Sequence, residues 1–270
     1  MVNKKKQRFP AWGLLIVKGL AFYTLCTLSF IAASTITTGF ASAVKDHLSM
    51  TLAVVLTALL ILLFSRSETV GLKVSGVIPG KSTFPRFFCG YLIGLAMAFG
   101  QACIVMGFGH VHLRLVADLT IIRVFGSFAL YLLAALREEL VFRSYALTSL
   151  RMSLGPVAAL SIITVIFILE HVAAGMPVGM AIIGSGMGGL LFGYAALKTK
   201  GLALPLGLHS AWNFGQWALA FKAGPGIWQA ETGHASTVDA QSIGMIAFVL
   251  IMAITMAGIH FFYRKQNMGV

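Results

Sequence analysis

Long apolar runs constrain this chain more than any other feature of its sequence. A helix needs roughly 20 mostly apolar residues to cross the hydrocarbon core of a membrane, and each run approaches that length. The loops between the runs are short, so there is no room for a separate soluble domain. The runs are residues 11–34, 48–65, 86–108, 119–138, 156–173, 178–197, 202–221 and 242–263. The sequence therefore predicts an all-α fold, a polytopic transmembrane bundle of about eight spans in which residues 1–270 form a single membrane domain.

The amino-acid composition supports a membrane protein and argues against nucleic acid as a partner. Apolar residues make up 58% of the chain and charged residues only 10%, whereas soluble domains carry about a quarter charged residues. The net charge of +12 does not indicate a nucleic-acid binder, because Lys and Arg fall in short gaps between apolar runs and not on a polar module. The lipid bilayer is the expected partner. Cys26, Cys89 and Cys103 lie in apolar runs, and we expect them to be small buried hydrophobic residues.

The basic residues also predict an orientation. Positive loops stay on the cytoplasmic side of a membrane, and one choice of orientation places nearly all of them there. We therefore expect both termini in the cytoplasm, an even number of spans, and only Lys45, Arg114 and Lys222 in the outer loops. The residues predicted to be cytoplasmic are Lys4, Lys5, Lys6, Arg8, Arg66, Lys73, Lys81, Arg86, Arg137, Arg143, Arg151, Lys198, Lys200, Arg264 and Lys265.

Ionisable groups are costly inside a membrane, so the spans that carry them are informative. The first group is Arg137-Glu138-Glu139-Leu140-Val141-Phe142-Arg143, at the end of the fourth run. On a helix Glu139 and Arg143 are four residues apart, so they share a face and can pair. Glu138 need not share that partner and suits a general base. The alternative is an ordinary interfacial cluster where a helix leaves the membrane.

Two further groups contribute histidines. His171 follows Glu170 late in the fifth run, where it can accept a proton, bind a metal or cap a helix; the sequence assigns no role to Glu170. His209 and Asn213 are four residues apart in the seventh run and share a helix face, with Pro205 one turn earlier. Such a pair can donate hydrogen bonds to a developing oxyanion. It can equally form a structural contact between helices, and His209 alone can be a metal ligand.

Taken together, the three groups resemble the motifs of the CPBP family. They are EExxxR at Glu138, Glu139 and Arg143, FxxxH at Phe167 and His171, and HxxxN at His209 and Asn213. The family joins the CAAX prenyl proteases to bacterial bacteriocin-processing and self-immunity proteins, the Abi group. The resemblance covers roughly residues 120–220, the predicted catalytic core. It implies a multi-pass intramembrane endopeptidase in a bacterial plasma membrane, with a peptide or lipidated protein tail as substrate.

The resemblance also implies roles for these residues. Glu138 would activate a water with help from His171, while His209 and Asn213 would bind the oxyanion. Glu139 and its arginine partner would support the site. The family has been described both as metalloproteases and as metal-free glutamate proteases. Because the chain lacks HExxH, the usual zinc motif, we expect no obligatory cofactor. If zinc binds, the ligands implied are His171, His209 and Glu138.

Two other functions stay open, and one difficulty needs an explanation. The chain can be a non-catalytic immunity or interaction protein, or a transporter, although it shows no internal repeat of the kind that transporters have. Hydropathy places Glu138 near the cytoplasmic end of the fourth span and His171 near the outer end of the fifth. Their depths then differ by about 20 Å. A shared site requires that the polar run from Glu138 to Ser153 continue a longer fourth helix.

Overall fold

The computed structural model describes residues 12–66, 70–109, 111–222, 224, 226–232 and 237–265. The basic N-terminal residues Lys4, Lys5, Lys6 and Arg8 lie outside these ranges. The elements in chain order are α1 (Trp12–Ile36), α2 (Ser42–Arg66), α3 (Thr83–Phe108), β1 (Val111–Leu115), α4 (Ile121–Glu138), the π-helix η1 (Glu139–Ala146), α5 (Leu147–Leu154), α6 (Pro156–Ala173), α7 (Val178–Met180), the π-helix η2 (Ala181–Ser185), α8 (Gly186–Thr199), α9 (Ala203–Ala218), β2 (Trp228–Thr232) and α10 (Thr237–Phe262).

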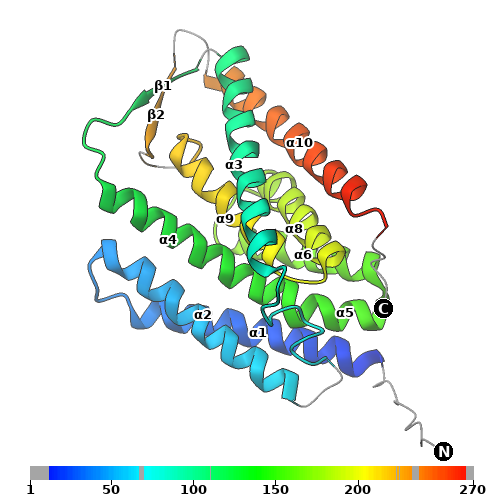
Figure 1. The fold of residues 1–270 in the computed structure, drawn as a ribbon. Helices are drawn as coiled ribbons and strands as arrows, with labels where there is room; N and C mark the ends of the chain where they lie inside the picture. Colours follow the sequence, from blue (N-terminus) through cyan, green and yellow to red (C-terminus); the bar gives the residue numbers. More distant parts are fainter. Residues whose placement is uncertain are drawn as a thin grey trace, which may run out of the picture.

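Each predicted run coincides with a helix except for a few residues at its ends, and the all-α polytopic membrane bundle is confirmed. Within the described residues, six helical segments are long and apolar enough to cross a membrane. The two predicted spans outside that set are α4 and α9, which are shorter or more polar and carry the candidate site. The total of eight crossings and the cytoplasmic termini stay predictions. In Figure 1 the start of α1 and the end of α10 lie toward the same end of the bundle, as an even number of crossings requires.

Helix α9 lies between α3 and α4 and approaches α3 very closely (Figure 1). A Cβ atom at Gly207 would lie 2.1 Å from the carbonyl oxygen of Phe87, so only glycine fits there. Small residues let helix backbones approach in lipid, where van der Waals packing replaces the hydrophobic drive. On its other side α4 contacts α2, which pairs with α1. This order of helices holds His209 beside the end of α4.

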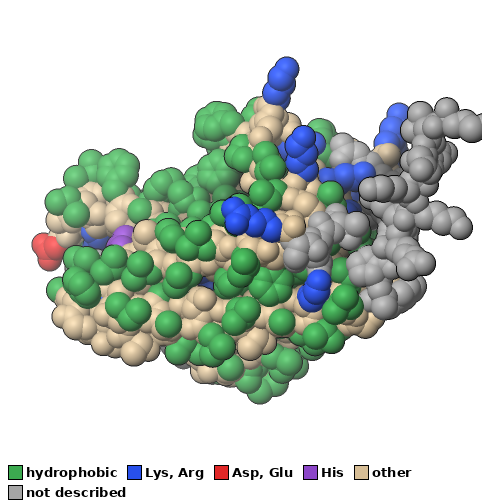
Figure 2. Space-filling view, turned by 90° about the horizontal axis from the view of Figure 1, so that it is seen from below, with side chains coloured by type: hydrophobic (Ala, Val, Ile, Leu, Met, Phe, Trp, Pro, Cys, Tyr) green, Lys and Arg blue, Asp and Glu red, His purple; other side chains and the backbone are tan. Residues whose placement is uncertain are grey.

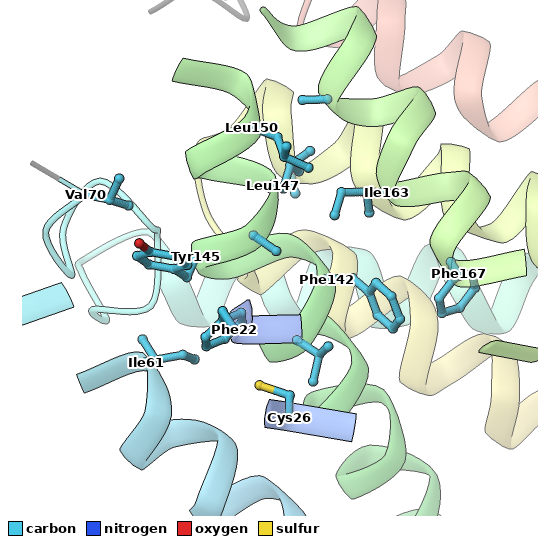
Figure 3. Packing of buried hydrophobic residues seen from close by; sticks show 14 of the residues in the cluster. Phe22, Cys26, Ile61, Val70, Phe142, Tyr145, Leu147, Leu150, Ile163 and Phe167 are labelled. Carbon is cyan, nitrogen blue, oxygen red and sulfur yellow. The ribbon is translucent and has the colours of Figure 1, made fainter. Parts of the chain in front are cut away.

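The apolar core next to the candidate site joins five helices around η1 (Figure 3). Phe142 and Tyr145 of η1 are fully buried. Phe142 packs edge-on against Phe167 of α6, with ring centroids 4.9 Å apart, and Tyr145 packs against Phe22 of α1 at 5.2 Å. These rings fix η1 on both sides. Behind them α8 packs on α6, where a Cβ at Gly193 would lie 2.5 Å from the Leu160 side chain, so the glycine-rich sixth run serves close helix packing.

A short antiparallel pair of strands closes the end of the bundle opposite the start of α1 (Figure 1). Strand β1 pairs with β2 in the register Val111↔Thr232 to Leu115↔Trp228. The sequence did not predict these strands, because each lies in a connection between helices and neither has a long alternating pattern. Their pairing ties the α3–α4 connection to the α9–α10 connection, so the segment after α9 folds back toward α4.

The outer surface is that of a protein in lipid. Large hydrophobic side chains are widely exposed, among them Ile122 at 80% and Phe262 at 82%. Seen from the side of α1 and α2, hydrophobic side chains cover much of the face, and most of the visible Lys and Arg gather toward one end (Figure 2). The prediction of buried cysteines holds for Cys26 and is wrong for Cys89 and Cys103, which α3 turns to the outer surface.

Candidate active site

Glu138 and Glu139 lie where α4 changes into a π-helix and not at the end of a helix. The helical path continues through η1, with a kink at Ser144 (φ −86°, ψ −106°), and then through α5 to Leu154. Such π segments are rare and frequently occur at functional sites. The limit that hydropathy set for the fourth span at residue 138 is therefore wrong. The charged residues after Glu138 lie inside the protein because their charges have partners there. The fourth helix is therefore longer than hydropathy indicates, as a shared site requires.

The imidazole of His209 lies between the two carboxylates. Its Nδ1 is 2.9 Å from Glu139 Oε1, and its Nε2 is 3.6 Å from Glu138 Oε2. The Glu139 side chain has no exposed surface, whereas that of Glu138 is 20% exposed. An ionised carboxylate only accepts hydrogen bonds, so Nδ1 of His209 donates to Glu139 and Nε2 faces Glu138. Phe192 of α8 stacks on the ring, with centroids 4.4 Å apart, and fixes its plane.

Arg143 is the buried cation of this group. Its NH1 lies 3.5 Å from Glu139 Oε1, as the spacing of four residues predicts, and both side chains are fully buried. The guanidinium faces three aromatic rings, the nearest being Phe167 at 4.6 Å from the centroid. Aromatic faces attract a desolvated cation. Arg143 does not lie in a loop, as the predicted orientation assumed, because a carboxylate and aromatic rings hold its charge inside the bundle.

His171 reaches the same region from α6. Its Nδ1 lies 2.9 Å from the carbonyl oxygen of Phe167, one turn earlier, and the two rings are 4.4 Å apart. A carbonyl oxygen only accepts, so Nδ1 carries the hydrogen, and in the neutral ring Nε2 holds a lone pair. This hydrogen bond to the backbone fixes the tautomer of the histidine, and the Phe167 ring also contacts Arg143. His171 is half-buried and leaves Nε2 available to a water or a substrate.

A second buried ion pair, which the sequence did not predict, lies beside the first. Arg137 donates to Glu170 Oε1, and the Tyr23 hydroxyl donates to Glu170 Oε2 at 3.1 Å. The guanidinium of Arg137 also lies 4.6 Å from the ring centroid of Phe30. The predicted loop position of Arg137 is wrong for the same reason as that of Arg143. No spacing in the sequence predicts this pair, because Arg137 comes from α4 and Glu170 from α6. The one indication is that Arg137 directly precedes Glu138 and Glu170 directly precedes His171.

Glu138 is the point at which these groups meet. The basic groups nearest to its carboxylate belong to His209, His171, Arg137 and Arg143. Among the described residues no hydrogen-bond partner meets Glu138 Oε2, although this atom is buried. Asn213 lies one turn after His209 on α9 and is half-buried. Glu138 therefore offers a buried oxygen acceptor beside the imidazole of His209.

The possible metal ligands do not lie close enough together to form a metal site. Among the described residues, no three His, Cys, Asp or Glu side chains come together in a group that could hold a metal ion. Nδ1 of His209 and Nδ1 of His171 both form hydrogen bonds, so only their Nε2 atoms could bind a metal. As arranged, Glu138, His171 and His209 do not fit the three-ligand zinc site implied as an alternative.

A comparison with protein families relates this geometry to known proteins. Residues 120–215 match the family described as type II CAAX prenyl endopeptidase Rce1-like. The match confirms the resemblance drawn from the three motifs. It spans α4 to α9 and contains every residue of the candidate site, from Glu138 to Asn213. No curated protein matches the chain. The Rce1-like match and the apolar helices together support a multi-pass membrane protein with an intramembrane protease domain.

Proposed function

We propose that the chain is an intramembrane endopeptidase in which Glu138 activates the attacking water. The observation that carries the proposal is the buried Glu138 Oε2, which lacks a hydrogen-bond partner among the described residues and lies 3.6 Å from Nε2 of His209. A general base must reach the proton that it removes directly or through one water. A water between Glu138 and the Nε2 lone pair of His171 satisfies this requirement.

The remaining residues suit the steps that follow. Water attacks the scissile carbonyl carbon and gives its proton to Glu138, and the carbonyl oxygen becomes an oxyanion. Protonated His209, with Nδ1 held by Glu139, presents Nε2–H to this oxygen, and the amide of Asn213 is a second donor on the same helix. Glu138 then passes its proton to the leaving amine as the C–N bond breaks. Arg143 compensates the charge of Glu139 throughout.

The substrate that we propose is a peptide or a lipidated protein tail within the membrane, in agreement with the CAAX endopeptidase description of the matched family. A bacterial plasma membrane stays the expected location. No step of the proposed mechanism passes through a metal, because the donors do not fit a zinc site as arranged.

The direct test replaces Glu138 by Gln, which keeps the shape of the side chain and removes the base. We expect the rate constant for cleavage to fall by at least about a hundredfold while the protein folds normally. The measurement compares peptides in membranes of cells that express the wild type, Glu138→Gln or a control, Glu231→Gln, whose side chain is 51% exposed on β2. Turnover near that of the wild type in folded Glu138→Gln protein would overturn the proposal. Identical peptide profiles in all three strains would favour a non-catalytic membrane partner.

A further inference from the structure

A hollow of about 300 Å³, counting the space at its open mouth, lies where η1, α5, the end of α8 and the loop after α2 meet. Its lining includes three cations, Arg143, Arg151 and Lys200, and two hydroxyl side chains, Ser75 and Thr148. Among the described residues, no Asp or Glu lines it. A concave surface with several cations and no carboxylate attracts anions.

Close backbone contacts hold the walls of this hollow in place. Gly76, in the loop after α2, has a φ of +72°, and a Cβ atom there would lie 2.7 Å from the Cα of Gly201. Only glycine therefore lets this loop reach the connection between α8 and α9. Arg86 of α3 donates to the carbonyl oxygen of Thr199 at 2.9 Å. This bond also takes up a carbonyl at the end of α8 that would otherwise repel an anion.

The guanidinium of Arg143 brings unused donors to the lining. Its side chain has no exposed surface, and its NH1 lies 3.5 Å from Glu139 Oε1. Its Nε and NH2 are buried and form no hydrogen bond with the described residues. A buried donor without an acceptor costs about 1–3 kcal/mol, and a charged one costs more. Water can satisfy such donors, but the two further cations in the lining favour an acceptor that is also an anion.

We propose that this hollow binds a phosphate group, carried by the headgroup of an anionic lipid or present as free phosphate. Arginine binds phosphate through two parallel N–H···O bonds, which Nε and NH2 of Arg143 supply. Arg143 already compensates Glu139, so the positive charge that phosphate needs comes from Arg151 and Lys200. On the predicted orientation Lys200 lies on the cytoplasmic side, where basic pockets between helices bind phosphate-bearing headgroups.

The test measures binding to the purified full-length protein in an uncharged detergent. One arm titrates inorganic phosphate against chloride at equal ionic strength and follows the midpoint of thermal unfolding, which a ligand of the folded state raises. The other arm measures the binding of fluorescently labelled phosphatidic acid and diacylglycerol, which differ only in the phosphate. For the wild type we expect at least about tenfold tighter binding of phosphatidic acid, the size of one charge-assisted hydrogen bond.

Two charge reversals separate the hollow from the general charge of the surface. Lys200→Glu places a carboxylate in the lining at an exposed position, so it should fold normally and lose at least about tenfold in affinity. Lys81→Glu makes the same change of charge at an exposed lysine in the loop after α2 and should bind like the wild type. Arg151→Gln, on the opposite wall, should also weaken binding.

Each outcome decides the proposal. Binding that is lost in Lys200→Glu and kept in Lys81→Glu supports the site; a response to phosphatidic acid alone then identifies a lipid headgroup, and a response to inorganic phosphate identifies a free anion as a ligand. Phosphate also stabilises folded proteins without binding to a site, so a rise in the unfolding midpoint that persists in Lys200→Glu counts against the hollow. No response to either probe, or equal losses in the two charge reversals, overturns the proposal. Because no measurement requires cleavage, the result is independent of the proposed catalytic function.

Discussion

The ion pair between Arg137 and Glu170 provides a quantitative test of what holds the site together. The two side chains are 4% and 17% exposed, and Glu170 also accepts a hydrogen bond from Tyr23. Arg137 precedes Glu138 on α4, and Glu170 precedes His171 on α6. The pair therefore fixes the helix that carries the proposed base against the helix that carries its histidine partner.

The expected magnitude follows from burial. Removing one member of a buried ion pair leaves the other charge without compensation and costs about 3–5 kcal/mol. Replacing both members by apolar residues of similar size is often nearly neutral. We expect Arg137→Met and Glu170→Met each to lower the free energy of unfolding by about 3 kcal/mol, and the double variant to lose far less than the sum, with a coupling energy of about 2 kcal/mol or more.

The assay is a double-mutant cycle on the free energy of unfolding, measured in one detergent throughout. A matched control is the pair Arg114 and Glu231, whose charged atoms are 3.4 Å apart but whose side chains are 70% and 51% exposed. Exposed pairs contribute at most about 1 kcal/mol. Additive losses at Arg137 and Glu170, or a coupling energy no larger than that of the control pair, would refute the reasoning that a desolvated pair joins α4 to α6.

Three further predictions concern the site and its scaffold. Glu139→Gln keeps an acceptor for His209 but loses the charge that compensates Arg143, and we expect kcat to fall about tenfold to a hundredfold in protein whose circular dichroism is unchanged. Gly207→Val should sharply lower the yield of folded protein, because a Cβ there meets the α3 backbone, whereas Gly13→Val, with open space at its Cβ, should not. The purified protein should keep its activity after thorough chelation; stoichiometric zinc whose removal abolishes activity and whose return restores it would contradict this.

The helical bundle was predictable because its signal is local. Each span is a continuous apolar run, and hydropathy located these runs to within a few residues at most ends. Hydropathy gave a wrong helix end at residue 138, because charged residues lower the hydropathy there and so indicate the end of a span. Hydropathy is averaged over neighbours in the sequence, so it contains no information that Arg137 and Arg143 pair with carboxylates inside the protein. The helix continues from α4 through η1 only because those partners are present. The sequence predicted this continuation only on the condition that Glu138 and His171 share a site.

Within the site, what could be predicted depended on whether two partners lie on one helix. The Glu139–Arg143 pair follows from a spacing of four residues, and the structure contains it. The contact of Glu139 with His209 and that of Arg137 with Glu170 join residues 70 and 33 positions apart. No periodicity in a single sequence indicates such contacts. The strands β1 and β2 were missed for the same reason, since neither pairs with its neighbour in the chain.

Charge balance limits how the buried cluster is protonated. Two arginines cannot neutralise three glutamates, and a net charge deep in a bilayer costs at least about 2.5–3.5 kcal/mol. One added proton makes the cluster neutral, and His209, between two carboxylates, is placed to hold it. In that state Glu138 is ionised and can accept a proton, while Nε2–H of His209 can donate. In the proposed mechanism, the proton that Glu138 gains from the attacking water offsets the negative charge that forms on the oxyanion. The reaction then moves charge within the site without changing its total, so the surrounding lipid does not oppose it.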